Sequence, residues 1–224
     1  MERACLVTGK SGPLLAEIVR QAAARQRQIL LTRSGRMDSG AHEDDAISTI
    51  AWNRRSALSS RSVLLHATNL FGRLDEAVVV FAPAHDTATF HESSIVGIED
   101  RIDAEVKGYL YILREILAVF MKQGGGRVVL VLQEPPGELQ SPLEAAGVGS
   151  FTALADALAR YYQNEPVAFH RLRTDGDDAA GFAAMILDLL DAQSRHSSGS
   201  GRSGRRWLRF PSRIRVWRRG TALR

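Results

Sequence analysis

The side chains best suited to metal binding are six histidines and one cysteine, and they are scattered along the chain. The histidines stand at positions 42, 66, 85, 91, 170 and 196. None has a cysteine or a second histidine at the spacing that places two zinc ligands on one helix face. The sequence therefore predicts no metal site.

Two further features suggest acid–base or nucleophilic chemistry. His85 and Asp86 follow an apolar run at residues 76–81. At the end of a parallel strand they would lie where a ligand cleft opens and could act as an acid–base pair; we prefer the alternative, polar loop residues. Cys5 lies within an apolar run, which is typical of a small buried side chain. A single cysteine excludes an intramolecular disulfide and favours a cytoplasmic location.

Gly9-Lys10-Ser11 is like the last residues of a nucleoside-triphosphate P-loop. That motif also needs a glycine five residues before Gly9, where this sequence has Ala4. We therefore exclude a P-loop.

Short runs rich in Val, Ile and Leu alternate with helical patterns along the chain. The predicted strands are residues 4–8, 28–33, 62–66, 76–81, 127–132 and 167–173, and the predicted helices are residues 14–24, 44–53, 98–121, 151–162 and 179–192. Strands that are apolar almost throughout are typical of a sheet covered on both faces. The alternation predicts an α/β fold with a Rossmann-like, doubly wound parallel sheet.

The helix over residues 98–121 has a broader apolar stripe than a surface helix needs, because Ile112 and Val119 extend it. Two interpretations are open. Either the helix is buried deeply in the core, or one of its sides packs into the core and the other forms a subunit interface.

The net charge of +4 hides a strong asymmetry. Of 29 basic residues, ten arginines fall in residues 195–224, which contain no acid, so residues 1–194 carry −6 and the remainder +10. The pI of about 9.6 therefore describes the tail, and we do not expect the whole protein to bind nucleic acid.

We divide the chain into a domain at residues 1–193 and a segment at residues 194–224. The segment is rich in Ser and Gly up to residue 204, and then apolar residues alternate with arginine. This alternation, carried by Leu208, Phe210, Ile214 and Val216, predicts a last strand. Alternatively, the arginine face meets a membrane surface, RNA or an acidic partner.

Several segments together resemble the short-chain dehydrogenase/reductase family. Residues 71–81 are similar to its segment entering the fourth strand, residues 104–129 to its fourth helix and fifth strand, and residues 151–159 to the helix after its catalytic tyrosine. With Val7-Thr8-Gly9, the resemblance covers about residues 4–192. It implies about seven strands, the last one formed by the tail.

The resemblance also implies a dinucleotide site, which is altered here. The candidate cofactor-binding residues in the phosphate loop are Thr8, Gly9, Ser11 and Gly12. The later glycines of the family's loop correspond to Pro13 and Leu15, and leucine adds bulk where backbone should contact phosphate.

Other cofactor positions of the family differ as well. The acidic residue after its third strand corresponds to His66, and its Asn-Asn-Ala-Gly segment corresponds to residues 79–82. Arg33, at the end of the second strand, fits a ribose 2′-phosphate, but an exposed arginine at a strand end is the simpler interpretation. We therefore expect no cofactor, or NADP(H) if there is one.

The family's catalytic Ser-Tyr-Lys-Asn set has no counterpart here. The asparagine corresponds to Glu105, the serine to Gln133, the tyrosine to Ser141 or to Ala146, and the lysine to Ala145. Residues 134–150 contain neither tyrosine nor lysine. The resemblance thus implies a fold without its usual general acid–base group.

The leading hypothesis is a non-catalytic pseudoenzyme that serves as an accessory subunit. It would associate through residues 98–121 and 151–162, with Ile112, Val119, Phe151 and Leu158 at the interface. The partner would be another copy or an active short-chain dehydrogenase/reductase. The alternatives are a divergent NADPH-dependent oxidoreductase, and a scaffold whose basic tail docks on a membrane or nucleic acid.

Overall fold

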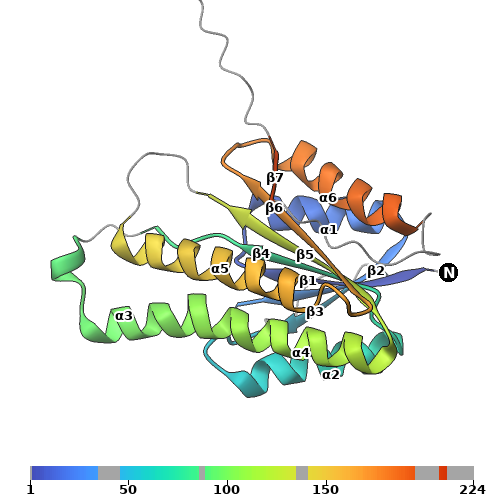
Figure 1. Ribbon diagram of the computed structural model, residues 1–224, viewed down its shortest axis with the longest axis horizontal. Helices are drawn as coiled ribbons and strands as arrows, with labels where there is room; N and C mark the ends of the chain where they lie inside the picture. The colour runs from blue at the N-terminus through green and yellow to red at the C-terminus, as the bar shows by residue number, and fades with distance from the viewer. Residues whose placement is uncertain (1, 35–45, 86–88, 135–140, 195–206, 211–224) are drawn as a thin grey trace, which may run out of the picture.

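The computed structural model describes residues 2–34, 46–85, 89–134, 141–194 and 207–210, which form one sheet between two layers of helices (Figure 1). The sheet has seven strands in the order β3-β2-β1-β4-β5-β6-β7, and every neighbouring pair is parallel. This confirms the predicted Rossmann-like, doubly wound α/β sheet.

The elements follow the expected alternation of strands and helices. The strands are β1 (Arg3–Gly9), β2 (Arg27–Arg33), β3 (Ile47–Ala51), β4 (Glu76–Phe81), β5 (Gly126–Gln133), β6 (Val167–Thr174) and β7 (Leu208–Phe210). One face of the sheet is covered by α1 (Pro13–Ala24) and α6 (Ala179–Ser194), and the other by α2 (Ala57–Phe71), α4 (Gly108–Gln123) and α5 (Pro142–Tyr161) (Figure 1). After the short 3-10 helix η1 (Phe90–Glu92), α3 (Ile95–Ile102) continues into α4 through the π-helical turn η2 (Asp103–Lys107).

Two predicted elements are wrong. Residues 62–66 do not form a strand, because they lie in α2, where Ser56 caps the helix by accepting a hydrogen bond from the Ser59 backbone N–H. The helix predicted over residues 44–53 is a strand where it is described, since Ile47–Ala51 pair with β2. His66 therefore does not follow the third strand; Trp52 and Asn53 do.

The start of α5 also differs from the prediction. The helix begins at Pro142, nine residues before the predicted start, because Ser141 and Glu144 form a capping box. The Ser141 side chain accepts a hydrogen bond from the Glu144 N–H, and the Glu144 carboxylate accepts one from the Ser141 N–H.

Two of the four predicted interface residues belong to the core of the chain. The side chains of Ile112 and Phe151 are buried between the sheet and its helices, so they cannot contact a second chain. Val119 and Leu158 are half-buried at the edge of the same core. Both interpretations of the helix over residues 98–121 place one of its sides in the core, and this common part is confirmed; the subunit interface stays a prediction.

The predicted last strand is confirmed for the three residues that the structure describes. Leu208–Phe210 pair with β6, and the Trp207 indole N–H donates a hydrogen bond to the Asp156 carboxylate at 2.8 Å. The Phe210 ring lies 5.3 Å from that of Phe182 in α6. Ile214 and Val216, which continue the alternation, lie outside the described residues. In the described part of the chain, no helix is long and apolar enough to cross a membrane.

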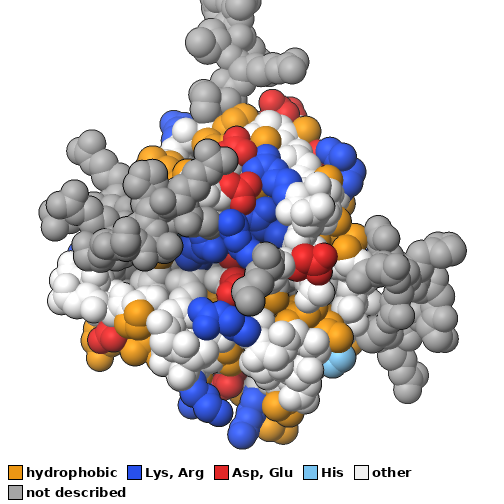
Figure 2. Space-filling view, turned by 90° about the vertical axis from the view of Figure 1, so that its right-hand side faces the viewer, with side chains coloured by type: hydrophobic (Ala, Val, Ile, Leu, Met, Phe, Trp, Pro, Cys, Tyr) orange, Lys and Arg blue, Asp and Glu red, His pale blue; other side chains and the backbone are white. Residues whose placement is uncertain are grey.

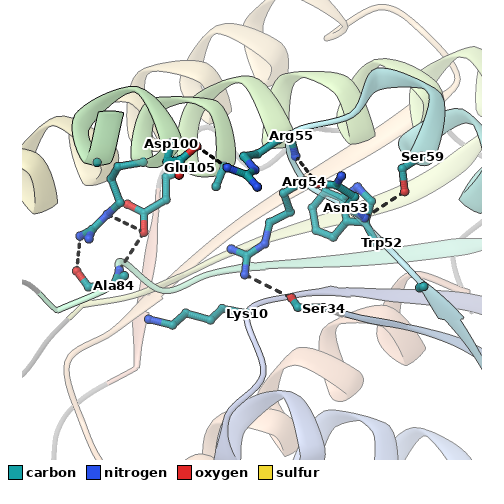
Figure 3. Close-up of a pocket in the computed structure, with 14 residues that line it drawn as sticks. Lys10, Ser34, Trp52, Asn53, Arg54, Arg55, Ser59, Ala84, Asp100 and Glu105 are labelled. Atoms are coloured by element: carbon teal, nitrogen blue, oxygen red, sulfur yellow. Dashed lines mark hydrogen bonds and ion pairs between the residues drawn. The ribbon is translucent and has the colours of Figure 1, made fainter. Parts of the chain in front are cut away.

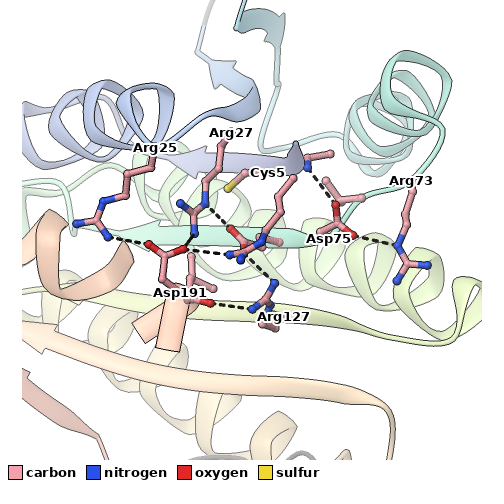
Figure 4. Close-up of polar contacts among 12 residues, drawn as sticks. Cys5, Arg25, Arg27, Arg73, Asp75, Arg127 and Asp191 are labelled. Carbon is pink, nitrogen blue, oxygen red and sulfur yellow. Dashed lines mark hydrogen bonds and ion pairs between the residues drawn. The ribbon is translucent and has the colours of Figure 1, made fainter. Parts of the chain in front are cut away.

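Charged side chains gather where the strands begin, on the face that Figure 2 presents. The Glu76 carboxylate is fully buried there and pairs with Arg27 at 2.7 Å, Arg127 at 3.0 Å and Arg3 at 3.2 Å. Asp191, near the end of α6, pairs with Arg27 at 2.8 Å, Arg25 at 2.9 Å and Arg3 at 3.0 Å (Figure 4). This ionic network joins β1, β2, β4 and β5 to α1 and α6.

Because of this network, the free energy of unfolding should decrease as the pH becomes acidic. Burial acts to raise the pKa of Asp191, but hydrogen bonds from Arg27 and Arg25 together lower it further, so the pKa lies below its ordinary value. A carboxylate whose pKa is lowered by folding stabilises the protein above its unfolded pKa, and that contribution is lost as the pH falls through the folded pKa.

We expect Asp191→Asn to lower the free energy of unfolding by about 1 kcal/mol at neutral pH, a modest figure because solvent screens a carboxylate that is 35% exposed. Below a pH of about 4 the difference from the wild type should shrink towards zero. Urea unfolding followed by circular dichroism between neutral and acid pH measures it. Asp188→Asn, at a carboxylate that is 70% exposed, is the control and should have a smaller effect. A difference that does not change with pH contradicts this account.

Candidate functional site

A cleft of about 790 Å³ lies at the carboxyl ends of the first four strands (Figure 3). Strand order reverses between β1 and β4, and open α/β sheets bind ligands outside the strand ends at such a point. Residues that directly follow β1, β2 and β3 line the cleft together with residues of α3 and η2. Its volume lies in the range of small-molecule sites.

Two cations in this cleft have no carboxylate partner among the described residues. Lys10 follows β1, and its ammonium donates a hydrogen bond to the Pro83 carbonyl at 3.3 Å. Arg54 follows β3, makes a long 3.4 Å hydrogen bond to Ser34, and has its guanidinium 5.9 Å from the Trp52 ring. Burial lowers the pKa of the Lys10 ammonium, and Arg101 and Arg54 act in the same direction against Glu105. The cleft is therefore electropositive on two walls.

The acidic side chains of the cleft are neutralised within the chain. Asp100 forms an ion pair with Arg55, and Glu105 pairs with Arg101 at 2.9 Å. Glu105 Oε1 also accepts a hydrogen bond from the Ala84 backbone N–H at 2.9 Å. The two acids therefore do not cancel the charge of Lys10 and Arg54.

Glu105 is only 5% exposed and is held in the π-helical turn η2. Its Oε2 atom is buried and has no hydrogen-bond partner among the described residues. A Cβ at Gly147 of α5 would lie 2.9 Å from this oxygen, so α5 packs closely over the carboxylate at this glycine. Such turns are often found at functional sites, and a buried carboxylate oxygen without a hydrogen-bond partner is uncommon in folded proteins.

His85 lies beside the cleft and pairs with a residue far away in sequence. Its Nδ1 atom is 3.1 Å from Glu144 Oε1, and the Glu144 side chain is buried. Asp86, its predicted partner, lies outside the described residues. The acid–base pair with Asp86 therefore stays the less favoured alternative, while Glu144 of α5 gives His85 a carboxylate partner.

Tyr109 contacts the cleft residue Trp52 edge to face, and its environment does not suit the role of the family's general acid. Its hydroxyl donates a hydrogen bond to the Val80 carbonyl at 2.9 Å. Burial raises its pKa to about 12. Burial also raises the pKa of the Cys5 thiol well above its usual range, which fits a core residue. No group of three or more potential metal ligands occurs in the described part of the chain.

The predicted cofactor-binding residues lie at the rim of the strand ends but do not line the cleft. Thr8 is buried and accepts a hydrogen bond from the Thr32 hydroxyl at 2.8 Å, whereas Ser11 and Gly12 are exposed. Gly12 is the N-cap of α1, and Pro13 at the first helical position has no N–H to offer a phosphate. Arg33 is exposed at the end of β2. Their role in cofactor binding stays a prediction.

The packing of β1 against β4 explains why residue 9 is a glycine, whether or not a phosphate binds there. Its φ angle is +151°, and an added Cβ would lie 2.2 Å from the Val80 carbonyl oxygen of β4. Gly12 is different, because nothing lies within 4 Å of its Cβ position and its φ of 174° suits any residue.

We expect Gly9→Ala to lower the free energy of unfolding by at least about 2 kcal/mol, because β1 and β4 must separate to admit the methyl group. Gly12→Ala should cost about 1 kcal/mol or less, as for an N-cap change. Urea unfolding of both variants and the wild type measures this. Equal effects at the two glycines contradict the packing role of Gly9.

The positions that correspond to the family's catalytic set are spread over three elements. Glu105 lies in η2, Gln133 ends β5, and Ser141 caps α5. Ala145 and Ala146 are exposed in the first turns of α5. Of these, only Glu105 lines the cleft. Sequence reasoning missed Lys10, Arg54 and Arg101 as cleft residues. The signal for Arg54 was the run at residues 47–50, which is rich in β-branched side chains, forms most of β3 and ends shortly before it.

No protein-family model matches this sequence, and a search of curated proteins finds no significant match. Solved structures show the fold clearly. A short-chain dehydrogenase from Streptomyces avermitilis superposes with a TM-score of 0.73 at 18% identity, covering 94% of this chain and 88% of that one. A 3-ketoacyl-(acyl-carrier-protein) reductase from Brucella melitensis, complexed with NADH, has a TM-score of 0.73 at 15% identity, covering 92% and 96%.

A doubly substituted short-chain dehydrogenase/reductase from Serratia marcescens gives a TM-score of 0.70 at 14% identity, covering 92% of this chain and 96% of that one. The chain thus has the fold of the short-chain dehydrogenases/reductases over nearly its whole length. At this level of identity the likeness concerns the fold alone.

Proposed function

We propose that this chain is a non-catalytic subunit with a short-chain dehydrogenase/reductase fold, which associates with a second subunit through α4 and α5. One observation carries the proposal: these helices present an apolar groove of about 380 Å³, whose walls include Leu110, Leu117, Leu154, Leu158 and Tyr162. Exposed apolar surface of this kind marks an interaction site more often than it is left in water.

The surface of α5 beside the groove favours close helix packing. Its exposed residues are small and recur every three or four positions: Ala146, Gly149, Ala153 and Ala157. Residues at this spacing lie on one face of a helix, and small side chains let another helix approach. Ile112 and Phe151 are not part of this surface; they lie in the core and hold α4 and α5 against the sheet.

The described residues around the cleft supply no general acid of the family's kind. Tyr109 is tied to the Val80 carbonyl, Ala145 is exposed on α5, and Glu105 is paired with Arg101. A non-catalytic role explains why the apolar surface of α4 and α5 is present while the positions of the family's catalytic set hold other residues. The partner is another copy of the chain or an active reductase of the same fold.

We expect native mass spectrometry of the complex from the source cells to find a second subunit that carries an intact Ser-Tyr-Lys-Asn set, or a homo-oligomer without cofactor. Ala153→Arg places a long charged side chain on the small-residue face of α5 and should weaken association about tenfold or more. Leu65→Arg, on the exposed side of α2, is the control and should associate like the wild type. A monomer at all accessible concentrations, without a partner, refutes the proposal.

A divergent NADPH-dependent oxidoreductase is the second candidate, favoured by the electropositive cleft at the point where the sheet order reverses. Against it stands α1, whose first turn offers Pro13 and the buried Leu15 to a pyrophosphate. The fluorescence of NADPH distinguishes the two candidates, because it changes when the dinucleotide binds.

Under the leading proposal, titration of the purified chain with NADPH should show no binding in the micromolar range and no turnover of carbonyl substrates. Micromolar binding that is lost on Arg33→Ala, together with NADPH oxidation, would establish the oxidoreductase instead.

A further inference from the structure

The two edges of the sheet, β3 and β7, differ in their protection against pairing with a further strand (Figure 1). The unpaired N–H and C=O groups of an edge strand can bind another chain, and natural proteins usually prevent this with charged residues, proline or a bulge. β7 has Arg209 at its centre, and Pro211 follows it in the sequence. β3 (Ile47–Ala51) contains no charge and no proline, and it pairs with β2 without a bulge. Of the two edges, β3 is therefore the one without these protections.

The outer side of β3 carries backbone groups that no described residue binds. The Ala46 carbonyl and the Trp52 N–H each form a hydrogen bond of 2.8 Å to β2, so the even-numbered residues between them also turn their backbone towards β2. Because successive residues of a strand turn their N–H and C=O groups to opposite sides, those of Ile47, Thr49 and Ala51 point away from the sheet. In the part of the chain that the structure describes, no hydrogen bond satisfies these groups. A strand from another chain would satisfy them.

These outward groups favour one register for a second copy of β3 in antiparallel orientation. Residues that exchange hydrogen bonds across an antiparallel pair must point at each other, so each odd-numbered residue must lie opposite an odd-numbered residue of the second copy. All of them are used only when Thr49 lies opposite Thr49, and Ile47 opposite Ala51. That register is symmetric about Thr49, as a twofold dimer requires, and it forms about six main-chain hydrogen bonds.

The side chains of β3 suit the same register. All of them are half-buried, and Ile47 and Ile50 pack against the cores on opposite faces of the sheet. A twofold axis normal to the sheet keeps each side chain on its own face. Thr49 then pairs with Thr49, and Ile47 with Ala51, while Ser48 lies opposite Ile50 on the other face. Threonine pairs and pairs with a β-branched residue are favourable across strands, so a second copy covers the apolar surface that β3 leaves exposed.

The charges on either side of β3 favour the antiparallel direction. In the sequence, three acids at residues 43–45 precede the strand, and Arg54 and Arg55 follow it. The acids lie outside the described residues, but their order along the chain is enough: antiparallel strands direct the acidic end of one copy to the basic end of the other, whereas parallel strands would bring like charges together. Arg55 also pairs with Asp100 of its own chain, but both side chains are more than half exposed, where such a pair contributes little.

We propose that two copies of this chain pair through β3 in antiparallel orientation, so that their sheets form one continuous sheet with Thr49 at the twofold axis. This interface goes beyond the subunit role proposed above and is separate from it, because no residue of β3 lines the groove between α4 and α5. A chain bound through α4 and α5 would still present β3, so neither association requires the other.

Disulfide formation in the purified full-length chain tests the register directly. In the proposed pairing the two Cα atoms of residue 49 lie about 5.5 Å apart, a separation that a disulfide spans without movement of the backbone. Oxidation of Thr49→Cys at micromolar concentration should therefore convert most of the chain into a covalent dimer on a non-reducing gel. Ala51→Cys, on the same face of the same strand, is the matched control. Its two Cα atoms would lie roughly 14 Å apart, so it should give little dimer. The native Cys5 is buried and should not contribute.

Sedimentation velocity measures the association without a cross-link. Thr49→Lys places two like charges opposite each other and, because the backbone of residue 49 does not bond to β2, leaves the pairing of β3 with β2 in place. This variant should weaken dimerisation about tenfold or more. Asn69→Lys, at an exposed position of α2, adds the same charge away from β3 and is the control. Both variants are combined with Ala153→Arg, so that association through α4 and α5 does not obscure the result.

The proposal is supported if Thr49→Cys forms the covalent dimer, Ala51→Cys does not, and Thr49→Lys dissociates while Asn69→Lys does not. It is overturned if Thr49→Cys forms no dimer, if both cysteine variants form it equally, or if Thr49→Lys and Asn69→Lys associate alike. A chain that is monomeric with Ala153→Arg alone also overturns it, and leaves association through α4 and α5 standing. Conversely, association that Ala153→Arg does not affect and Thr49→Lys abolishes refutes the α4 and α5 interface and keeps this one.

Discussion

The buried carboxylate of Glu76 is the constraint on which the rest of the molecule depends. It lies in the central strand β4 without solvent and is surrounded by Arg3, Arg27 and Arg127, from β1, β2 and β5. Removing one partner of a buried ion pair typically costs about 3–5 kcal/mol, so these four strands must begin in one fixed register. Their carboxyl ends then finish at matching heights, and the loops after them can build a cleft from residues distant in sequence.

The architecture was predictable from the sequence, because buried parallel strands are apolar along most of their length and β1, β4 and β5 are of this kind. The two elements that were predicted wrongly, residues 62–66 and 44–53, show where this apolar pattern no longer distinguishes a strand from a helix. Val63 and Leu64 resemble a strand, yet they are part of a helical face, and Ile47 and Ile50 have helical spacing on an edge strand that is half-buried throughout. At such positions tertiary pairing decides between two local patterns that the sequence supports equally.

The candidate site was less predictable, since its members come together only through the sheet order. Glu105 was identified through the family resemblance, but its partner Arg101 and the overlying Gly147 follow from helix packing. The pairing of His85 with Glu144 joins residues 59 positions apart. In the adjoining core, the ring centroids of Phe81, Tyr109 and Phe151 lie 4.9 to 5.5 Å apart.

The π-helical turn Asp103–Lys107 determines where the gene can change in length. Such a turn is closed by i→i+5 hydrogen bonds and holds one residue more than an α-helical turn. The loss of one codon within it would therefore leave an α-helical turn, with Arg101 still in the cleft and Ile116 and Phe120 still in the core. The same loss in the first turn of α4 would rotate the rest of that helix by about 100° and take Phe120 out of the core. Descendants of this sequence should therefore change in length within the π-helical turn and keep the length of α4.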